Sequence, residues 1–321
     1  MNNPINYLAS DAVKASVNAL EFNLSEWDKN PRIGGLLSKT VLAGGKKLRP
    51  LMTFIMGDLF KIPHKEITPF GTAVEMVHAS TLAHDDVIDG ADTRRGQPSI
   101  NAVSSNKQAV LAGDYLLAHV LSEVAKSGRN DVVVELAAVI SDLAEGEWLQ
   151  IDNAKNENLN IEDINRVASK KTGSVIRWCC VTPALIADQT SAIVEKCRQL
   201  GESIGVAFQK SDDILDYKRN DGSEFADAKN GVVSSVSFYL LSNRTTPENQ
   251  KISSSNLKSQ TFSQEEIDQA ISQVREEVNA NLNHGNEIVS YLEDQLAPLN
   301  ESQQNAINSL RTIIGYLAVR I

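Results

Sequence analysis

Residues 84–96 read HDDVIDGADTRRG and place three aspartates, Asp85, Asp86 and Asp89, directly after an apolar run. In an α-helix, with about 100° of rotation per residue, Asp85 and Asp89 lie one turn apart and Asp86 lies beside them. Three carboxylates this close cannot all stay ionised without a counter-charge. Mg²⁺ is usually held by one or two carboxylates and completes its coordination with waters and substrate phosphates, so the stretch predicts a magnesium site on a helix.

A second stretch, residues 208–216, reads FQKSDDILD and repeats the spacing with Asp212, Asp213 and Asp216. One such motif alone is explained equally well by a solvated helix face. Two copies, each preceded by apolar residues, are not typical of a surface. Two such helices that face each other predict a clamp of three metal ions around a diphosphate.

The composition favours a helical enzyme. The chain has 321 residues, of which 42% are hydrophobic, and only 9 prolines, so it can bury a large core as one or two domains. Long stretches rich in Ala, Leu, Glu, Lys and Gln favour helices, and no run of short β-branched segments is present, so we expect an all-α fold. The net charge of −10 and the lack of a basic run argue against a nucleic-acid partner.

The cysteines and the first residues of the chain give information about the cellular compartment of the protein. Cys179, Cys180 and Cys197 match no metal or disulfide framework, and the adjacent pair in an apolar run is expected to fill core. Residues 1–16 lack the basic and apolar regions of a signal peptide. No apolar run reaches about 18 residues, so we expect no transmembrane segment and a cytoplasmic enzyme.

Apolar periodicity predicts helices over 6–28, from Gly34-Gly35 onward, and over 67–89, 107–126, 131–152, 191–217, 264–296 and 301–319. Ser263 followed by Glu266 fits a capping box at the start of one of them. Residues 243–262 are polar and are expected to form an exposed loop or a small insertion rather than a linker. Residues 1–321 are therefore expected to form a single domain.

Three further groups suggest anion binding. Residues 44–50, GGKKLRP, suit phosphate oxygens through the clustered cations Lys46, Lys47 and Arg49, or form an ordinary basic helix start with Pro50 in its first turn. His78 lies two turns before Asp85; such a histidine is usually a satisfied core residue, but this spacing favours the site. Residues 170–173, KKTG, fit either a surface helix or a buried lysine, because an apolar run follows them.

GGKKLRP, EMVHASTLAHDDVIDGADTRRG, KKTG and GVAFQKSDDILD, in this order, resemble the trans-isoprenyl diphosphate synthases from about residue 40 to the C-terminus. The resemblance implies an all-α bundle of the isoprenoid-synthase type around a deep central cavity, a homodimer, and three Mg²⁺ ions, with Mn²⁺ as an alternative metal. It implies that four aspartates coordinate the metal: Asp85, Asp86, Asp89 and Asp212. Asp213 and Asp216 complete the second motif as catalytic residues.

The resemblance also implies two diphosphate sites. The allylic diphosphate is expected to be bound by Arg94, Lys171, Thr172 and Gln209, with Lys171 also expected to be catalytic. Isopentenyl diphosphate is expected to be bound by Lys46, Arg49, His78 and Arg95. Arg320, near the C-terminus, is a further candidate for that second site.

The implied reaction is the head-to-tail condensation of isopentenyl diphosphate with an allylic prenyl diphosphate. In this family a bulky aromatic residue four or five positions before the first aspartate closes the cavity and stops growth early. Thr81 and Ser80 stand there and are small, and Val77 is modest in size. The motif also has the spacing of the longer-chain branch, so we expect an all-trans product beyond C15, of medium or long chain. A farnesyl or geranylgeranyl diphosphate synthase is the short-chain alternative.

The chain departs from the family after the second motif, where a Gly-Lys pair, an Asp and a Gly-Lys-x-Thr-Leu-Pro segment are usual. Residues 222–236 read GSEFADAKNGVVSSV, so Asp227 and Gly231 match, but Val232 and either Gly222 or Ser223 replace lysines. Each charge-assisted hydrogen bond lost would weaken binding by about 1.5–3 kcal/mol. Another cation could take the place of a missing lysine only if the loop were remodelled. The candidates are Lys218, Arg219 and Lys229.

This departure leaves a second class of function open, a weakly active or non-catalytic partner subunit that binds isoprenoid diphosphates. A terpene cyclase is disfavoured, because it has no need of three cations that hold a second diphosphate: Lys46, Arg49 and Arg95.

Overall fold

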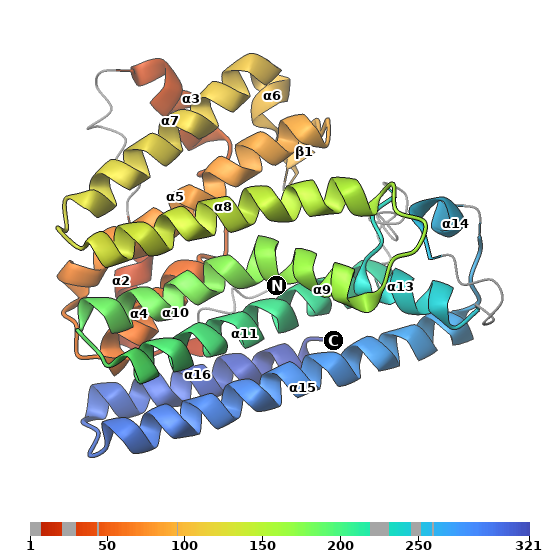
Figure 1. The fold of residues 1–321 in the computed structure, drawn as a ribbon. Helices are drawn as coiled ribbons and strands as arrows, with labels where there is room; N and C mark the ends of the chain where they lie inside the picture. The colour runs from red at the N-terminus through yellow and green to blue at the C-terminus, as the bar shows by residue number, and fades with distance from the viewer. Residues whose placement is uncertain are drawn as a thin grey trace. The chain divides into compact units, whose positions relative to one another are not determined.

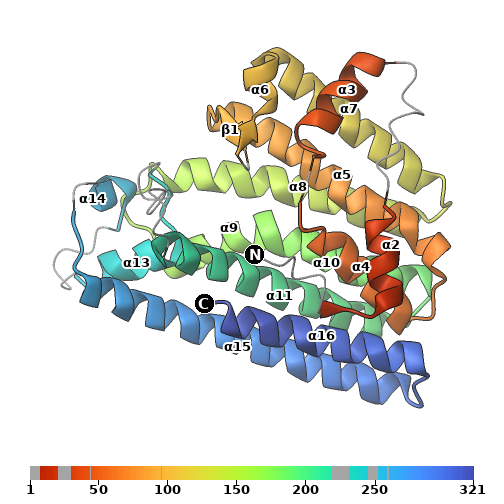
Figure 2. The same ribbon diagram turned by 180° about the vertical axis from the view of Figure 1, so that it is seen from behind.

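The computed structural model describes residues 8–20, 30–43, 45–94, 96–218, 231–244, 252–258 and 260–321. Helices make up nearly all of the regular structure in this part of the chain (Figures 1 and 2). Its only sheet is a short antiparallel hairpin of β1 (Thr93–Arg94) and β2 (Gln97–Pro98). The predicted all-α fold is confirmed.

The chain falls into two compact units. The first consists of Met1–Ala137, Thr182–Thr190 and Leu299–Ser309, and the second of Ala138–Val181, Ser191–Pro298 and Leu310–Ile321. The expected single domain over 1–321 stays a prediction.

The first unit is built around one long helix, α5 (His64–Ile88), which packs against α4 (Leu48–Leu59) and α7 (Asn106–Ala125). The remaining helices of this unit are shorter or lie only partly in it: α2 (Asp11–Asn18), α3 (Pro31–Lys39), α6 (Ile100–Val103), the start of α8 (Asn130–Asn153), the end of α10 (Ser174–Ile186) and the start of α16 (Glu301–Val319). Nearly every side chain of α4 is buried, which makes this helix the centre of the unit's core.

The contact between α5 and α7 is close because α7 has a glycine there. A Cβ atom at Gly113 would lie 2.3 Å from His84 Nε2. The hydroxyl of Ser80 donates to the carbonyl oxygen of Gly113 at 3.0 Å, and His84 Nε2 lies 3.2 Å from the carbonyl oxygen of Val110. The last turns of α5, which carry the first aspartate motif, are thereby fixed against α7.

The second unit is organised on α11 (Ser191–Lys218), which runs side by side with α15 (Gln264–Leu296) (Figures 1 and 2). On another side α11 packs against a π-helical turn, η2 (Ser169–Gly173). The other helices that lie wholly in this unit are α9 (Ile161–Ala168), α13 (Ser235–Ser242) and α14 (Ser254–Lys258). Most of α8, the start of α10 and the end of α16 also belong to it.

Two glycines allow α11 to approach η2 and α10 at backbone distance. A Cβ atom at Gly201 would lie 2.3 Å from Arg177 Cα, and one at Gly205 would lie 2.6 Å from Gly173 Cα. Real Cβ atoms do not make such contacts, so these positions exclude any side chain. The close approach places the turn that carries the KKTG residues next to the helix that carries the second aspartate motif.

Most of the predicted helices are confirmed within a few residues, and two differ. The helix predicted over 6–28 ends at Asn18, where the ammonium of Lys47 donates to the carbonyl oxygens of Val17 and Leu20, both at 3.3 Å. A cation at a helix C-terminus stabilises that end; residues 21–28 lie outside the described residues. The helix expected from Gly34 begins earlier, at Pro31, a residue suited to the first helical position.

The stretch 243–262, expected as an exposed loop or small insertion, contributes to a small core. Its buried Ile252 and Leu257 pack in a cluster with Phe238 of α13. The capping box of Ser263 and Glu266 at the start of α15 is confirmed. Residues 245–251 and 259 lie outside the described part of this stretch.

The three cysteines are free and buried, as expected of core residues. Burial raises the pKa of the Cys180 thiol well above its usual range, which makes it a poor nucleophile. Among the helices that the structure describes, none combines the length and apolar character needed to cross a membrane.

Candidate active site

The first aspartate motif occupies the C-terminal end of α5. The amide of Asp89 donates to the carbonyl oxygen of Asp85 at 2.8 Å, which confirms that these residues lie one turn apart. The side chain of Asp86 is completely buried, and its Oδ1 accepts a hydrogen bond of 2.6 Å from Arg94 Nε. Its Oδ2 is also buried and has no hydrogen-bond partner within the described residues.

The β1–β2 hairpin brings Arg94 back to this motif. Arg94 pairs in register with Gln97, and Gly96 adopts a φ of 75° in the turn between them. A positive φ is readily adopted by glycine, which explains the residue at this place. Sequence periodicity could not reveal the hairpin, because each strand has two residues. Arg95, predicted to bind isopentenyl diphosphate, lies outside the described residues.

The other residues predicted to bind isopentenyl diphosphate lie on α4, just before it, or on α5, and these two helices pack together. Lys46 is exposed just before α4, Arg49 is half-buried in its first turn, and His78 is half-buried on α5. Lys47, the N-cap of α4, adopts a left-handed backbone with a φ of 46° and binds the end of α2 as described above. Of the two lysines in this stretch, Lys46 is therefore exposed, whereas Lys47 has a structural role.

In the second motif, Asp213 belongs to a chain of hydrogen bonds that links three elements. Thr172 of η2 donates to Gln209 Oε1 at 2.7 Å, and Gln209 Nε2 donates to Asp213 Oδ1 at 3.0 Å. The amide of Ser235, at the start of α13, donates to Asp213 Oδ2 at 3.0 Å. Burial raises the pKa of Asp213, although these hydrogen bonds act against the shift. The structure thus brings together three predicted residues and adds Ser235, which no sequence motif indicated.

Asp212, the neighbour of Asp213, is far more accessible. Its side chain is 41% exposed, and its Oδ1 pairs with Nη2 of Arg320. The guanidinium of Arg320 also lies over the ring of Phe208, 4.8 Å from its centroid. Arg320 was a candidate for the isopentenyl site, and the structure places it at the second aspartate motif. Asp216 is buried.

The π-helical turn η2 separates two adjacent lysines. Lys170 binds Asp142 and Glu145 at 2.6 and 2.8 Å, whereas Lys171 pairs with Glu147 and lies 3.1 Å from Gln150 Oε1. π-Helical turns are rare and occur frequently at functional sites. No motif assigned a role to Glu147 or Gln150; the available signal was a pair of polar residues three positions apart in a helix.

The residues expected to limit product length lie on α5 but differ in their surroundings. Val77 and Ser80 are buried, and the hydroxyl of Ser80 points to Gly113 of α7. Thr81 is half-buried and its hydroxyl donates to the carbonyl oxygen of His78 at 2.8 Å. Thr81 therefore has more freedom to accept a larger side chain than Ser80.

The acidic residues form no preformed metal cage in the described part of the chain. In the described ranges, no group of three or more His, Cys, Asp or Glu side chains lies close enough together to hold a metal ion. Nevertheless, the available donors are all carboxylate oxygens, and Asp86 has one buried oxygen without a partner. Mg²⁺ takes one or two carboxylates and phosphate oxygens. The donors fit an ion that binds together with a diphosphate rather than a preformed protein cage.

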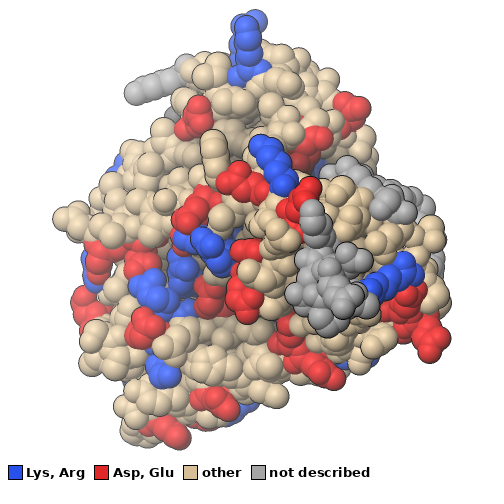
Figure 3. Space-filling view, turned by 45° about the vertical axis from the view of Figure 1, so that its right-hand side comes forward, with Lys and Arg blue, Asp and Glu red and all other residues tan. Residues whose placement is uncertain are grey.

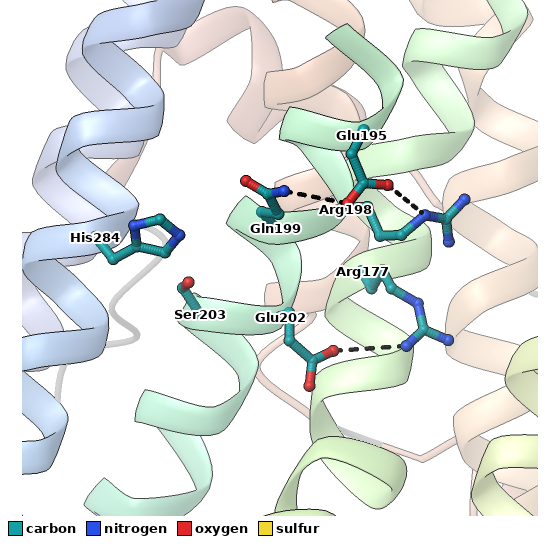
Figure 4. Close-up of a pocket in the computed structure, with 7 residues that line it drawn as sticks. All are labelled: Arg177, Glu195, Arg198, Gln199, Glu202, Ser203 and His284. Atoms are coloured by element: carbon teal, nitrogen blue, oxygen red, sulfur yellow. Dashed lines mark hydrogen bonds and ion pairs between the residues drawn. The ribbon is translucent and has the colours of Figure 1, made fainter. Parts of the chain in front are cut away.

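A cavity of about 350 Å³ lies in the second unit, and no residue of either aspartate motif lines it (Figure 4). Its charged side chains are paired with one another, Arg177 with Glu202 and Arg198 with Glu195, so it offers no excess charge to a diphosphate. The complete lining is Arg177, Glu195, Arg198, Gln199, Glu202, Ser203 and His284. On the face drawn in Figure 3, basic side chains are likewise interspersed with acidic ones.

A family model described as Polyprenyl synthetase matches residues 30–274, a range that contains both aspartate motifs. The chain belongs to the polyprenyl synthetase family. The predicted family is therefore confirmed.

Two curated polyprenyl synthetase relatives illustrate the range of products within this group. The farnesyl diphosphate synthase of Bacillus subtilis is 32% identical over 236 residues, which cover 70% of this chain and 78% of that protein. The nonaprenyl diphosphate synthase of Mycobacterium tuberculosis is 38% identical over 175 residues, which cover 54% of this chain and 52% of that protein. The chain spans about half or less of the length of several other curated relatives that it matches.

Solved structures of polyprenyl synthetases share the fold. The decaprenyl diphosphate synthase of Rhodobacter capsulatus superposes with a TM-score of 0.78 at 25% identity, and the match covers 99% of each chain. The isoprenoid-synthase fold predicted for this chain is confirmed.

Proposed function

We propose that this polyprenyl synthetase is an all-trans polyprenyl diphosphate synthase that condenses isopentenyl diphosphate with an allylic prenyl diphosphate. The observation that carries the proposal is the pair of aspartate motifs within the family match, one with a buried unpaired carboxylate oxygen and one with an accessible carboxylate. A prenyltransferase of this kind needs acidic residues that bind metal and cations that bind two diphosphates. Both classes of residue are present.

The proposed metal ligands are Asp85, Asp86, Asp89 and Asp212, and the expected metal is Mg²⁺, three ions per site, with Mn²⁺ as the alternative. When bound, the metal would supply Lewis-acid neutralisation of the charge that grows on the departing diphosphate. The allylic diphosphate would be held by Arg94, Lys171, Thr172 and Gln209. Isopentenyl diphosphate would be held by Lys46, Arg49, His78 and Arg95.

These residues would act by holding and orienting the two substrates. The C–O bond of the allylic diphosphate breaks with its electron pair on the diphosphate, and the double bond of isopentenyl diphosphate attacks the allylic carbon. A proton then leaves the new chain, with the released diphosphate as the expected acceptor. The two diphosphate sites would fix a near-attack geometry, and apolar walls would keep water from the cation. No side-chain nucleophile is required.

We infer a product of medium or long chain. Small residues at Ser80 and Thr81 and the relatives with nonaprenyl and decaprenyl products support this inference. The similarity to the farnesyl diphosphate synthase of Bacillus subtilis supports the short-chain alternative. Purified protein should be incubated with Mg²⁺, isopentenyl diphosphate and geranyl or farnesyl diphosphate. Products beyond C15 support the inference, whereas C15 as the end product from the shorter primer would establish the alternative.

A second candidate function is a partner subunit that binds isoprenoid diphosphates without elongating them. The observation in its favour is Val232, half-buried at a position where the family has a lysine. Incorporation of radiolabelled isopentenyl diphosphate by the wild type, compared with Asp85→Ala, separates the two functions. Incorporation above that of Asp85→Ala supports the synthase, and equal background with retained binding of farnesyl diphosphate supports the partner subunit.

We further propose a homodimer in the cytoplasm. Light scattering coupled to size-exclusion chromatography would measure the mass of the assembly. Fractionation of cells that express the full protein would test its location. The names of some relatives assign them to mitochondria, so an organelle fraction is the alternative outcome.

A further inference from the structure

Lys210 of α11 is an unusual residue for the interior of a protein. Its side chain is 2% exposed, and its ammonium forms an ion pair with Glu277 of α15, whose side chain is 25% exposed. Removing a charged group from water costs several kcal/mol, and a buried ion pair often contributes no net stability compared with apolar residues of similar size. A helix that needed only to pack against α15 would carry an apolar side chain at this position.

The same carboxylate also binds a residue of a third helix. The hydroxyl of Tyr239, on α13, donates to Glu277 Oε1. Burial, followed by the charge and hydrogen bond of Glu277, raises the pKa of Tyr239, so the hydroxyl stays protonated and remains a donor. Lys210, Glu277 and Tyr239, here called the Glu277 triad, therefore connect α11, α15 and α13 through one carboxylate.

The Glu277 triad holds one side of α11, and a second set of polar contacts holds another side. Gln209 binds Thr172 of η2, and Asp213 binds the amide of Ser235 at the start of α13. Residues 209 and 210 point in directions about 100° apart on a helix. The rotation of α11 about its own axis is thus fixed from two directions within one turn of Asp212.

We propose that the Glu277 triad positions the second aspartate motif, with Lys210 as its principal positioning residue. Buried ionic groups can fix one orientation where apolar packing permits several, at no gain in stability. A rotation of α11 would move Asp212 and Asp216 together, because both lie on this helix within two turns of Lys210. The inference rests on the proposed synthase function, since it assigns the triad a role in that site.

The test replaces the whole Glu277 triad, so that no charge or hydroxyl is left buried without a partner. The variant is Lys210→Met/Glu277→Leu/Tyr239→Phe, and its melting temperature should equal or exceed that of the wild type. Its kcat should fall roughly 100-fold, the scale expected for a misplacement of about 1 Å, and its Mg²⁺ requirement should rise. The KM for isopentenyl diphosphate should stay the same, because Lys46, Arg49 and His78 lie in the other unit.

Three single variants complete the test. Lys210→Arg keeps the ion pair and should retain most of the wild-type kcat. Arg244→Met breaks an exposed ion pair of 2.6 Å with Glu266 of α15 and should leave kcat and the Mg²⁺ requirement unchanged, which makes it the matched control. Tyr239→Phe removes one hydrogen bond without burying a charge. If the triple variant does not fold, Tyr239→Phe decides through the same two readouts, and it should lower kcat and raise the Mg²⁺ requirement.

The outcomes separate this inference from the proposed function. A wild type that forms product, together with a folded triple variant of unchanged kcat and Mg²⁺ requirement, overturns the positioning role and leaves the synthase function intact. A wild type that forms no product and binds no farnesyl diphosphate overturns both. An equal loss of activity in Arg244→Met would show a general effect of disturbing α15 and would also overturn the inference.

Discussion

Arg94 donates its Nε–H to Asp86 Oδ1 across 2.6 Å, and this contact joins the hairpin to the first aspartate motif. The carboxylate of Asp86 is completely buried, so Arg94 supplies the positive charge that its ionised form requires. The second oxygen of the same carboxylate has no partner in the described structure, so it is the one of the two that is left for a cation.

We expect Asp86→Asn to fold but to lose activity. Asparagine keeps the shape of the side chain and still offers a carbonyl oxygen to Arg94, whereas it cannot give a metal ion a negative charge. Turnover should fall about 10- to 150-fold, the effect of losing one charge-assisted contact. The measurement is kcat as a function of Mg²⁺ concentration, and the control is Asp92→Asn, an exposed carboxylate just after the motif. Wild-type turnover in Asp86→Asn would rule out Asp86 as a metal ligand.

The adjacent lysines of η2 should differ in their contribution to substrate binding. Lys171→Gln should raise the KM for the allylic diphosphate about 10- to 150-fold, because one ionic contact to the diphosphate is lost. Lys170→Gln should leave that KM unchanged, since two carboxylates, Asp142 and Glu145, hold Lys170, whereas Lys171 has only Glu147 among the described residues. Steady-state kinetics of the two variants provide the comparison. Equal effects would show that the turn as a whole, rather than Lys171, is responsible.

The two small residues before the first motif should respond differently to a bulky replacement. Thr81→Phe should fold and shorten the product, because Thr81 is half-buried. Ser80→Phe should unfold readily, since Ser80 is completely buried and donates to Gly113 of α7, and overpacking costs about 1–3 kcal/mol or more. Thin-layer chromatography of the products and thermal unfolding measure the two effects. A product of unchanged length from folded Thr81→Phe would contradict the assigned role of this position.

Two glycines of the second unit, Gly201 and Gly315, should respond in opposite ways to replacement by alanine. Gly201→Ala should lower the free energy of unfolding by about 1–3 kcal/mol, because the new Cβ would lie 2.3 Å from the backbone of Arg177. Gly315→Ala, on α16, should raise it by about 0.5–1 kcal/mol, because nothing lies within 4 Å and alanine favours helix. Urea unfolding of both variants measures the difference. A stabilised Gly201→Ala would show that α10 and α11 do not approach as closely as described.

Glu266 should stabilise the fold in a pH-dependent way. The hydrogen bond from Arg244, and next those from Ser263, lower the pKa of Glu266 from 4.5 to about 2. A carboxylate whose pKa is lower in the folded state contributes its full stabilisation above its unfolded pKa and loses it as pH falls toward its folded pKa. The wild type should therefore be more stable than Glu266→Gln at pH 7, and the difference should shrink between about pH 4.5 and pH 2. A difference that is constant over this range would contradict the role of the charge.

Much of the fold could be predicted from local pattern. The long helices α5, α11, α15 and α16 follow from apolar periodicity, and the start of α15 follows from Ser263 and Glu266. The break after Asn18 could not be predicted, because its stabilising cation, Lys47, comes from a distant part of the chain. The hairpin that carries Arg94 is too short for any periodic signal.

The sequence named the residues of the candidate site but could not indicate their contacts. The motif indicated Asp212 and Asp213 alike, whereas the structure leaves Asp212 accessible and directs Asp213 to Gln209 and Ser235. The spacing of residues along one helix cannot reveal such a difference. The difference depends on which other helices pack on each side of α11. For the same reason Lys210 gave no signal, because its partner Glu277 lies on a helix far along the chain.

The π-helical turn at Ser169–Gly173 depends on the number of residues in this segment as much as on their identity. A turn with i to i+5 hydrogen bonds contains one more residue than the ordinary helix on either side of it. Deletion of one residue would restore a regular helix but shift the register of everything before it, so that Lys170 and Lys171 could no longer each reach their own partners on α8. Substitutions can alter the chemistry of this segment one side chain at a time, whereas a change of a single codon in length would rearrange all of it at once.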